Sequence, residues 1–165
     1  MRPDAQSLTP GAAVLIQTKQ RFTKAQRLLR HADFERVYKQ GRRHFAAHMT
    51  FFYLARPSDA SGPRTRVGFT VSKALGGAVQ RNRMKRRLRE AVRFNGGGPG
   101  VDADVVINPK RSLLTAEFSD LRNQVARAFV VIEKTLKSET TKSETSKPDE
   151  TSQIESTSKK ETPQI

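Results

Sequence analysis

The sequence predicts an α+β domain in which helices pack on one small sheet. Stretches that alternate apolar and other residues are interspersed with stretches whose apolar residues recur at helical spacing. The resulting order is α-β-β-α-β-α, with room for one further strand. At 165 residues the chain is long enough for one domain and too short for two of ordinary size. It contains no Cys, which excludes disulfides and thiolate metal sites.

Both ends of the chain differ in composition from its middle. Residues 1–20 are mixed, carry Pro3, Pro10 and Gly11, and are predicted to form a flexible N-terminal extension. Residues 137–165 contain imperfect KSET units and almost no apolar residues, so they cannot bury enough surface to offset chain entropy. We therefore expect a disordered Lys/Ser/Glu/Thr-rich tail from residue 137 and a folded domain over residues 21–136.

The first half of this domain is predicted to contain one helix followed by extended segments. Residues 32–41 hold apolar residues at helical spacing, and Gly41 ends the helix. Residues 43–56 alternate and predict a strand, the sequence PSDASGP predicts a loop, and residues 66–73 predict another strand. The alternation places Phe45, Ala47, Met49, Phe51 and Tyr53 opposite His44, Ala46, His48, Thr50, Phe52 and Leu54, and Val67, Phe69 and Val71 opposite Gly68, Thr70 and Ser72.

The second half is predicted to contain two helices and one strand. A basic helix follows the alternating segment and stops at NGGGPG, and ADVVINPK predicts a short apolar strand that ends at Pro109. The last helix is amphipathic, with Thr115 as its expected N-cap. Its apolar face consists of Phe118, Leu121, Val125, Ala128, Phe129 and Ile132.

Positive charge is concentrated in the predicted helix at residues 81–93. The chain has a formal net charge of +15, more than solubility requires, which points to a polyanion: nucleic acid first, an anionic membrane surface second. The stretch RNRMKRRLREAVR holds six Arg and one Lys against the single acid Glu90. Because like charges three and four residues apart repel, and because Arg suits bidentate phosphate contact, this helix is expected to bind a nucleic-acid backbone.

A helical wheel divides this segment into two faces. Met84, Leu88, Ala91 and Val92 form an apolar stripe that is expected to pack on the core; the stripe is small and lacks Trp or Phe, which disfavours membrane binding. Composition does not separate RNA from DNA, but the preceding strand and Gly-rich turn disfavour a helix-turn-helix. The opposite side of the wheel holds Asn82, Arg86, Arg89 and Arg93, with Lys85 and Arg87 on the flanks.

Other function classes have little support. The sequence offers no Ser/His/Asp constellation or paired carboxylates for catalysis, and NGGGPG lacks the Lys of a phosphate-binding loop. The apolar run at residues 11–16 is shorter than a signal-peptide core or a membrane span. A cytoplasmic location is therefore expected.

The stretch TVSKALGGAVQRNRMKRRLREAVR resembles the RNR signature region of the bacterial ribonuclease P protein component. The resemblance extends from about residue 22 to residue 134 through RLLRHADFERVYKQG, RVGFTVSK and DADVVINPK. It implies a ribosomal protein S5 domain 2-like sandwich with a left-handed β-α-β crossover. It also implies a protein subunit, monomeric in isolation, that assists a catalytic RNA. That RNA uses magnesium to remove the 5′ leader of precursor tRNA, and the protein itself holds no metal firmly.

The resemblance also assigns roles to residues. The catalytic RNA would contact Lys73, Arg81, Asn82, Arg83, Lys85, Arg86 and Arg89. A cleft for the single-stranded leader would be lined by Phe34, Tyr38, Phe52, Thr70 and Ser72. The residues alone favour a plain core role for the three aromatics, although small residues at 68, 70 and 72 suggest a shallow trough beside them that suits base stacking.

Two departures from the family pattern concern the turn before the basic helix. Ala74 stands where the family often has a second Lys, and Gly77 where it often has an Asn, so RNA contacts there are expected to be missing or shifted. Two alternative functions remain open from the sequence: a general RNA-binding or ribosomal protein with no processing role, and a DNA-binding protein.

Overall fold

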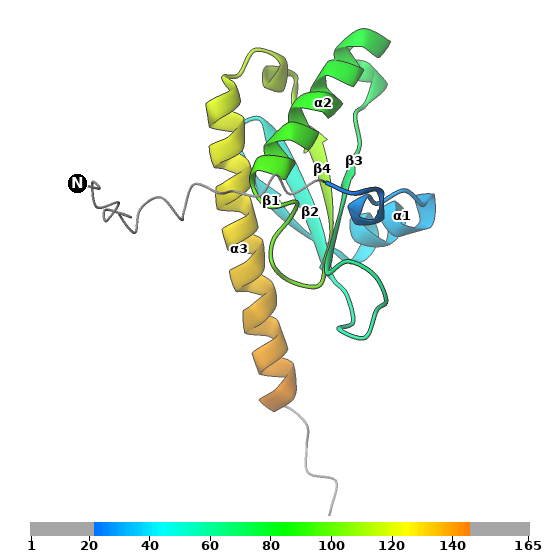
Figure 1. Ribbon diagram of the computed structural model, residues 1–165, viewed down its shortest axis with the longest axis vertical. Helices are drawn as coiled ribbons and strands as arrows, with labels where there is room; N and C mark the ends of the chain where they lie inside the picture. The colour runs from blue at the N-terminus through cyan, green and yellow to red at the C-terminus, as the bar shows by residue number, and fades with distance from the viewer. Residues whose placement is uncertain (1–21, 146–165) are drawn as a thin grey trace, which may run out of the picture.

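The computed structural model describes residues 22–145, which form a four-stranded mixed sheet flanked by three α-helices (Figure 1). This confirms the predicted α+β class, with the one further strand. The elements are η2 (Lys24–Gln26), α1 (His31–Gln40), β1 (Arg42–Phe45), β2 (Met49–Ala55), β3 (Thr65–Phe69), η3 (Lys73–Leu75), α2 (Ala78–Phe94), β4 (Ala103–Pro109), η4 (Arg111–Leu114) and α3 (Phe118–Thr145).

The strand order in the sheet is β1-β2-β4-β3. β1 pairs antiparallel with β2, and β2 antiparallel with β4, whereas β3 and β4 are parallel neighbours connected through α2. The predicted β-α-β unit is therefore present. Central β4 is an almost continuous apolar run because both of its faces are covered.

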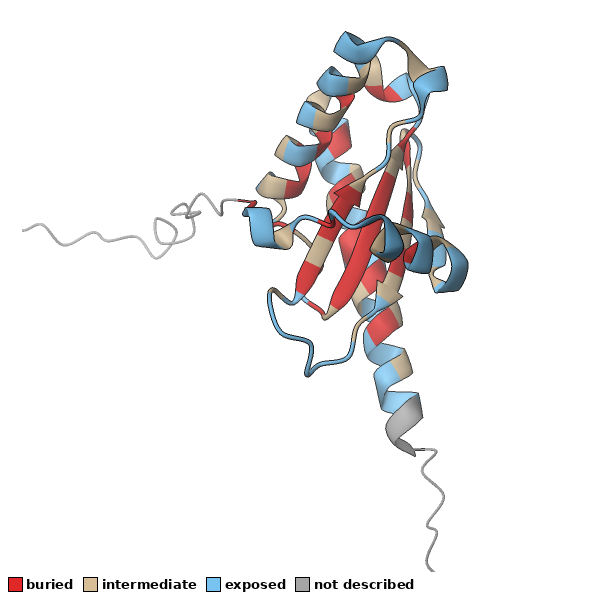
Figure 2. Ribbon diagram, turned by 90° about the vertical axis from the view of Figure 1, so that its right-hand side faces the viewer, coloured by how far each residue is buried: buried red, intermediate tan, exposed pale blue. Residues whose placement is uncertain are grey.

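The sheet separates two apolar clusters of unequal size. α2 and α3 lie together on one face, whereas α1 packs on the other (Figures 1 and 2). Alternation along β2 sends Met49, Phe51 and Tyr53 into the larger cluster under α2 and α3. Phe52 and Leu54 point to the smaller cluster under α1. The predicted inward and outward sets of β2 are confirmed.

The segment at residues 43–56 is not one strand, as the sequence predicted, but a hairpin. β1 and β2 are joined by a tight turn at residues 46–48, where the Ala46 N–H donates to the Met49 carbonyl at 2.9 Å. Phe45 was expected on the same face as Met49, yet it is 68% exposed on the edge strand. The register pairs Phe45 with Thr50 and His44 with Phe51, so the turn shifts the alternation by one residue: Phe45 shares the face of Thr50, and His44 that of Phe51, the reverse of the faces predicted for a single strand.

α3 continues beyond the predicted end of the domain. It runs to Thr145, whereas the sequence predicted disorder from residue 137. Leu136 is buried, Lys137 pairs with Glu133 one turn earlier, and Glu139 pairs with Arg42 of β1. Leu136 thus ends the apolar face of the helix, and the ion pairs of Lys137 and Glu139 accompany its continuation to Thr145. The predicted extension at residues 1–20 and the remainder of the predicted tail, residues 146–165, lie outside the described residues.

The sequence predicted Thr115 as the N-cap of α3, and this prediction is wrong. It follows η4, where its hydroxyl donates to the Ser112 carbonyl at 3.3 Å, and α3 begins three residues later. Within residues 22–145, no helix has the length and hydropathy needed to cross a membrane.

Candidate nucleic-acid interface

Helix α2 presents one apolar face to the core and one basic face outward. Met84, Leu88, Ala91 and Val92 are completely buried, which confirms the apolar stripe predicted from the helical wheel. Red buried positions alternate with pale blue exposed ones along this helix in Figure 2. The buried stripe anchors α2 on the sheet and fixes which side chains face away from it.

The residues predicted to bind RNA lie on and beside the outward face of α2. Asn82, Arg83, Arg86 and Arg89 are exposed, whereas Arg81 and Lys85 are half-buried. Lys73 is exposed in η3, immediately before the helix. In the part of the chain that the structure describes, none of these cations forms an ion pair with an acid. The face is therefore an uncompensated patch of positive charge.

Two further features distinguish this face of α2. Nε of Arg81 is buried yet has no hydrogen-bond partner among the described residues, an uncommon state for a buried donor. Val79, Asn82, Arg83 and Arg86 line a hollow on the surface of the helix, and Val79 is 83% exposed. A backbone phosphate in this hollow would neutralise the charges of Arg83 and Arg86, and the sugar attached to it would cover the exposed Val79 side chain.

Arg87 differs from its neighbours on α2 because its guanidinium is used inside the protein. It donates to the carbonyls of Leu113 at 2.5 Å, of Leu114 at 2.8 Å, and of Ala116. These bonds hold the turn between β4 and α3 against the helix. The sequence placed Arg87 on the flank of the basic face, and no pattern in the sequence distinguishes this structural arginine from the free ones.

The three aromatic residues predicted to line a leader cleft come together on the α1 face of the sheet. Tyr38 and Phe52 contact edge to face, with ring centroids 4.8 Å apart. Phe34 joins them in the smaller apolar cluster around buried Val37 and Val106. All three aromatics are half-buried, so each combines packing with an accessible edge.

The predicted trough of small residues is wrong at Gly68. Gly68 is buried beneath Phe34, because a Cβ built there would lie 2.6 Å from the Phe34 ring. β4 also separates β3 from β2, so Phe52 and Gly68 both pair with Val106 rather than with each other. Phe34 therefore serves the core at least in part.

Thr70 and Ser72 lie after the end of β3 rather than within it. Both are exposed. The Thr70 N–H donates to the Ile107 carbonyl at 3.1 Å, and the Ser72 hydroxyl caps η3 by accepting from the Ala74 N–H at 3.2 Å. The role of both residues in a leader cleft stays a prediction.

The structure adds two polar residues to the aromatic site that the sequence did not indicate. The guanidinium of Arg43 lies over the Phe52 ring, 5.3 Å from its centroid. The Tyr38 hydroxyl donates to Oδ1 of Asn108 at 2.8 Å. Arg43 is paired with Phe52 by the β1–β2 register, a neighbour relation that depends on the hairpin the sequence did not predict.

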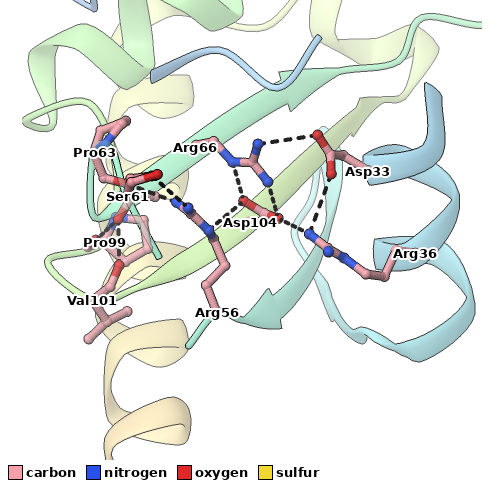
Figure 3. Close-up of polar contacts among 10 residues, drawn as sticks. Asp33, Arg36, Arg56, Ser61, Pro63, Arg66, Pro99, Val101 and Asp104 are labelled. Atoms are coloured by element: carbon pink, nitrogen blue, oxygen red, sulfur yellow. Dashed lines mark hydrogen bonds and ion pairs between the residues drawn. The ribbon is translucent and has the colours of Figure 1, made fainter. Parts of the chain in front are cut away.

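A buried carboxylate connects α1 to the sheet beside this site. Asp104 of β4 is fully buried and accepts from Nε of Arg66 at 2.8 Å and Nη2 of Arg66 at 2.7 Å (Figure 3). Arg36 of α1 donates to the same carboxylate at 2.9 Å, and Arg66 also reaches Asp33 at 3.2 Å. The hydrogen bonds that Arg66 donates to the Asp104 carboxylate raise the pKa of the Arg66 guanidinium, because they favour its charged form.

Arg56 links the same carboxylate to the loop between β2 and β3. Its Nε lies 3.7 Å from Asp104, and Nη1 donates to the Pro63 carbonyl at 2.9 Å (Figure 3). Within the described residues, no cluster of three or more His, Asp and Glu side chains has the arrangement of a metal site.

Comparison with known proteins identifies relatives of the chain. The family model described as Ribonuclease P matches residues 22–133. A ribonuclease P protein component of Citrifermentans bemidjiense is 38% identical over 117 residues, which cover 71% of this chain and 97% of the relative. The corresponding protein of Maridesulfovibrio salexigens is 43% identical over 92 residues, which cover 56% of this chain and 73% of the relative.

Solved structures agree with this result. An RNase P protein of Staphylococcus aureus superposes with a TM-score of 0.56 at 24% identity, covering 67% of this chain and 97% of that one, and supports the fold alone. The RNase P protein of Thermotoga maritima, at 26% identity, has a TM-score of 0.53 and covers 61% of this chain and 96% of that one. The family match stops at residue 133, so residues 134–145 of α3 lie beyond it.

Proposed function

Because the chain belongs to the ribonuclease P protein family, we propose that it binds the RNA subunit of ribonuclease P through the outward face of α2. The observation that carries this proposal is the row of arginines on α2 without acidic partners among the described residues. A uniform positive face on a rigid helix is suited to backbone phosphates, which supply most of the affinity in such complexes.

On this proposal the protein binds and the RNA performs the cleavage. The described residues offer paired arginines, an aromatic cluster and arginines without acidic partners. His48 Nδ1 lies 2.8 Å from the Ser112 hydroxyl, but no carboxylate among the described residues hydrogen-bonds that imidazole to orient it as a base. Magnesium would be held by the RNA, where it supplies charge stabilisation for phosphodiester cleavage. The protein would raise substrate and metal affinity by binding the RNA and the leader of precursor tRNA.

The leader would lie on the α1 face of the sheet. Tyr38 and Phe52 offer ring edges there, Arg43 offers a cation over the Phe52 ring, and Asn108 fixes the Tyr38 hydroxyl. Aromatic rings beside a cation are suited to stacking of unpaired bases without sequence preference. For a base to stack on the covered side of Phe52, Arg43 must swing toward a leader phosphate.

The decisive experiment is to purify the protein from its own cells and determine the size and sequence of the RNA bound to it. A single RNA of a few hundred nucleotides that cleaves precursor tRNA with magnesium supports the proposal. Ribosomal RNA would support a general RNA-binding protein, and genomic DNA a DNA-binding one. A double variant, Arg86→Ala with Arg89→Ala, should recover less of the same RNA at equal protein yield.

A further inference from the structure

An exposed aromatic ring lies where the end of α2 meets the start of α3. Phe94 is the last residue of α2 and is 43% exposed, although it is a large apolar side chain. Phe118 contacts its ring edge to face, with centroids 5.9 Å apart. The guanidinium of Arg122 lies over the Phe94 ring at 4.3 Å, and that of Arg93 lies at 5.6 Å.

The two arginines over this ring differ in what else they contact. Arg93 pairs with Glu90 on the same helix, so its charge is partly compensated. The Arg122 guanidinium has no hydrogen bond or ion pair to any residue in the described part of the chain; its only partner there is the ring. Stacking on a ring fixes the plane of a guanidinium while it leaves the N–H donors free. In this state Arg can form a bidentate contact with a phosphate.

The position of Arg122 is fixed by the backbone as well as by the ring. The Asn95 side-chain amide donates to the Ala91 carbonyl at 2.8 Å and to the Arg122 carbonyl at 3.1 Å. It therefore ties the end of α2 to the first turns of α3. Asn82, Arg86, Arg89 and Arg93 follow each other at helical spacing, so the outward row of α2 ends beside Phe94.

We propose that Arg122, ordered on Phe94, is a second phosphate-binding site that extends the RNA interface from α2 onto α3. This inference rests on the proposed function, because the ligand is the backbone of the same RNA subunit. Arg122 supplies the bidentate contact, Phe94 orders it, and Asn95 sets the spacing between the two helices. The interface then runs about 16 Å along α2, from residue 82 to residue 93, and continues onto α3.

The test is a binding titration with the ribonuclease P RNA transcribed from the genome of the source organism. Each phosphate contact contributes about 0.9 to the slope of log K against log salt, because it releases a counterion. One such contact therefore strengthens binding roughly fivefold when the salt concentration falls from about 1 M to about 0.15 M. Arg122→Ala should therefore weaken binding about fivefold at 0.15 M salt and reduce the slope of log K by about one. Arg122→Lys keeps the charge but loses the planar fork, and should recover only part of this loss.

The matched control is Arg127→Ala, which removes an exposed arginine of the same helix that has no aromatic ring beneath it within the described residues. It should leave the affinity nearly unchanged. Phe94→Leu keeps an apolar side chain but removes the ring, and should weaken binding in the same direction as Arg122→Ala. The melting temperature of each variant is measured in parallel, so that a loss of folding is not mistaken for a lost contact.

Three results would overturn the inference. If Arg122→Ala binds like wild type while Arg86→Ala weakens binding, the stack is packing between helices and only this inference fails. Equal losses for Arg122→Ala and Arg127→Ala would mean that net charge, not a built site, is responsible. If the wild-type protein does not bind this RNA at all, the proposed function fails and the inference fails with it.

Discussion

The arginines on the two sides of the sheet are used in opposite ways. On the α1 side, Arg36, Arg56 and Arg66 converge on buried Asp104. On α2, Arg86 and Arg89 face outward with no acidic partner among the described residues. The residue type is the same, and the local acid decides the role. Arginines beside the buried carboxylate stabilise the fold, whereas Arg86 and Arg89, which have neither an acidic partner nor the backbone carbonyls that Arg87 binds, are available to a ligand.

The two regions also differ in how the energetic cost of their charges is offset. A buried carboxylate is tolerated only when its charge is paired and its oxygens are hydrogen-bonded, and Arg66 and Arg36 supply those bonds. On α2 the repulsion between neighbouring cations costs a few tenths of a kcal/mol per pair. Four fully buried residues on the other face of the helix outweigh that cost.

The largest effect is expected from removing the acid on the α1 side. Asp104→Ala leaves Arg66 and Arg56, which are mostly buried, without their carboxylate, and loss of one partner of a buried pair costs about 3–5 kcal/mol. The free energy of unfolding, measured by urea denaturation, should fall by that amount.

The matched control is Asp102→Ala on the same segment. Asp102 pairs at 3.7 Å with Arg64, whose side chain is 72% exposed, and a surface pair of this kind contributes at most about 1 kcal/mol. Similar losses for both variants would contradict the view that Asp104 is the centre of the α1-side network.

A second prediction asks whether the α1 face binds RNA in addition to packing. Phe52→Ala should weaken binding of precursor tRNA by the assembled ribonucleoprotein by about 1–3 kcal/mol, the contribution of one base stacked on an aromatic ring. Binding of mature tRNA, which has no leader, should hardly change. Fluorescence titrations with both tRNAs measure the difference.

Phe51→Ala provides the comparison for Phe52, because the adjacent residue points to the opposite face and is fully buried. It should cost about 3–5 kcal/mol of stability and impair all RNA binding together. If Phe52→Ala behaves like Phe51→Ala, with equal losses for both tRNAs and a large drop in melting temperature, Phe52 belongs to the core alone.

A third prediction concerns the arginines of α2 that have no acidic partner among the described residues. Arg86→Ala and Arg89→Ala should each weaken binding to the RNA subunit about fivefold at 0.15 M salt and lower the slope of log K against log salt by about one. Circular dichroism should be unchanged, because both side chains are exposed.

Arg36→Ala on the α1 side should affect stability rather than RNA binding. It removes a bond to Asp104, so it should lower the melting temperature and leave the salt slope for the RNA subunit as in wild type. Slopes that fall equally for Arg36 and Arg86 would mean that the two sides do not differ in their contact with RNA.

The sequence could predict the roles that depend on local periodicity, but not those that depend on contacts between distant residues. The apolar stripe of α2 was predictable because helical periodicity is local, and so was the outward direction of Arg86. The structural role of Arg87 was not, because its partners are backbone carbonyls 26 to 29 residues away. The burial of Gly68 under Phe34 and the position of Arg43 over Phe52 likewise depend on long-range packing and strand order.

The smallest effects are expected from residues 138–165, which comprise the end of α3 and the segment that follows it. Residues 146–165 carry three lysines and four acids, a net charge of −1. Truncation after residue 145 should therefore leave the melting temperature unchanged and the RNA dissociation constant within about threefold, or roughly 0.65 kcal/mol.

Truncation after residue 137 additionally removes Glu139, which pairs with Arg42 of β1 while both side chains are more than a third exposed. Because an exposed ion pair contributes about 0–1 kcal/mol, the extra loss of stability should stay within that range. Glu139→Gln in the full chain isolates the pair from the helix that carries it, and should account for most of whatever loss the longer truncation shows. A loss well above 1 kcal/mol on truncation after residue 137, with Glu139→Gln silent, would mean that the helical extension stabilises the domain through contacts other than this ion pair.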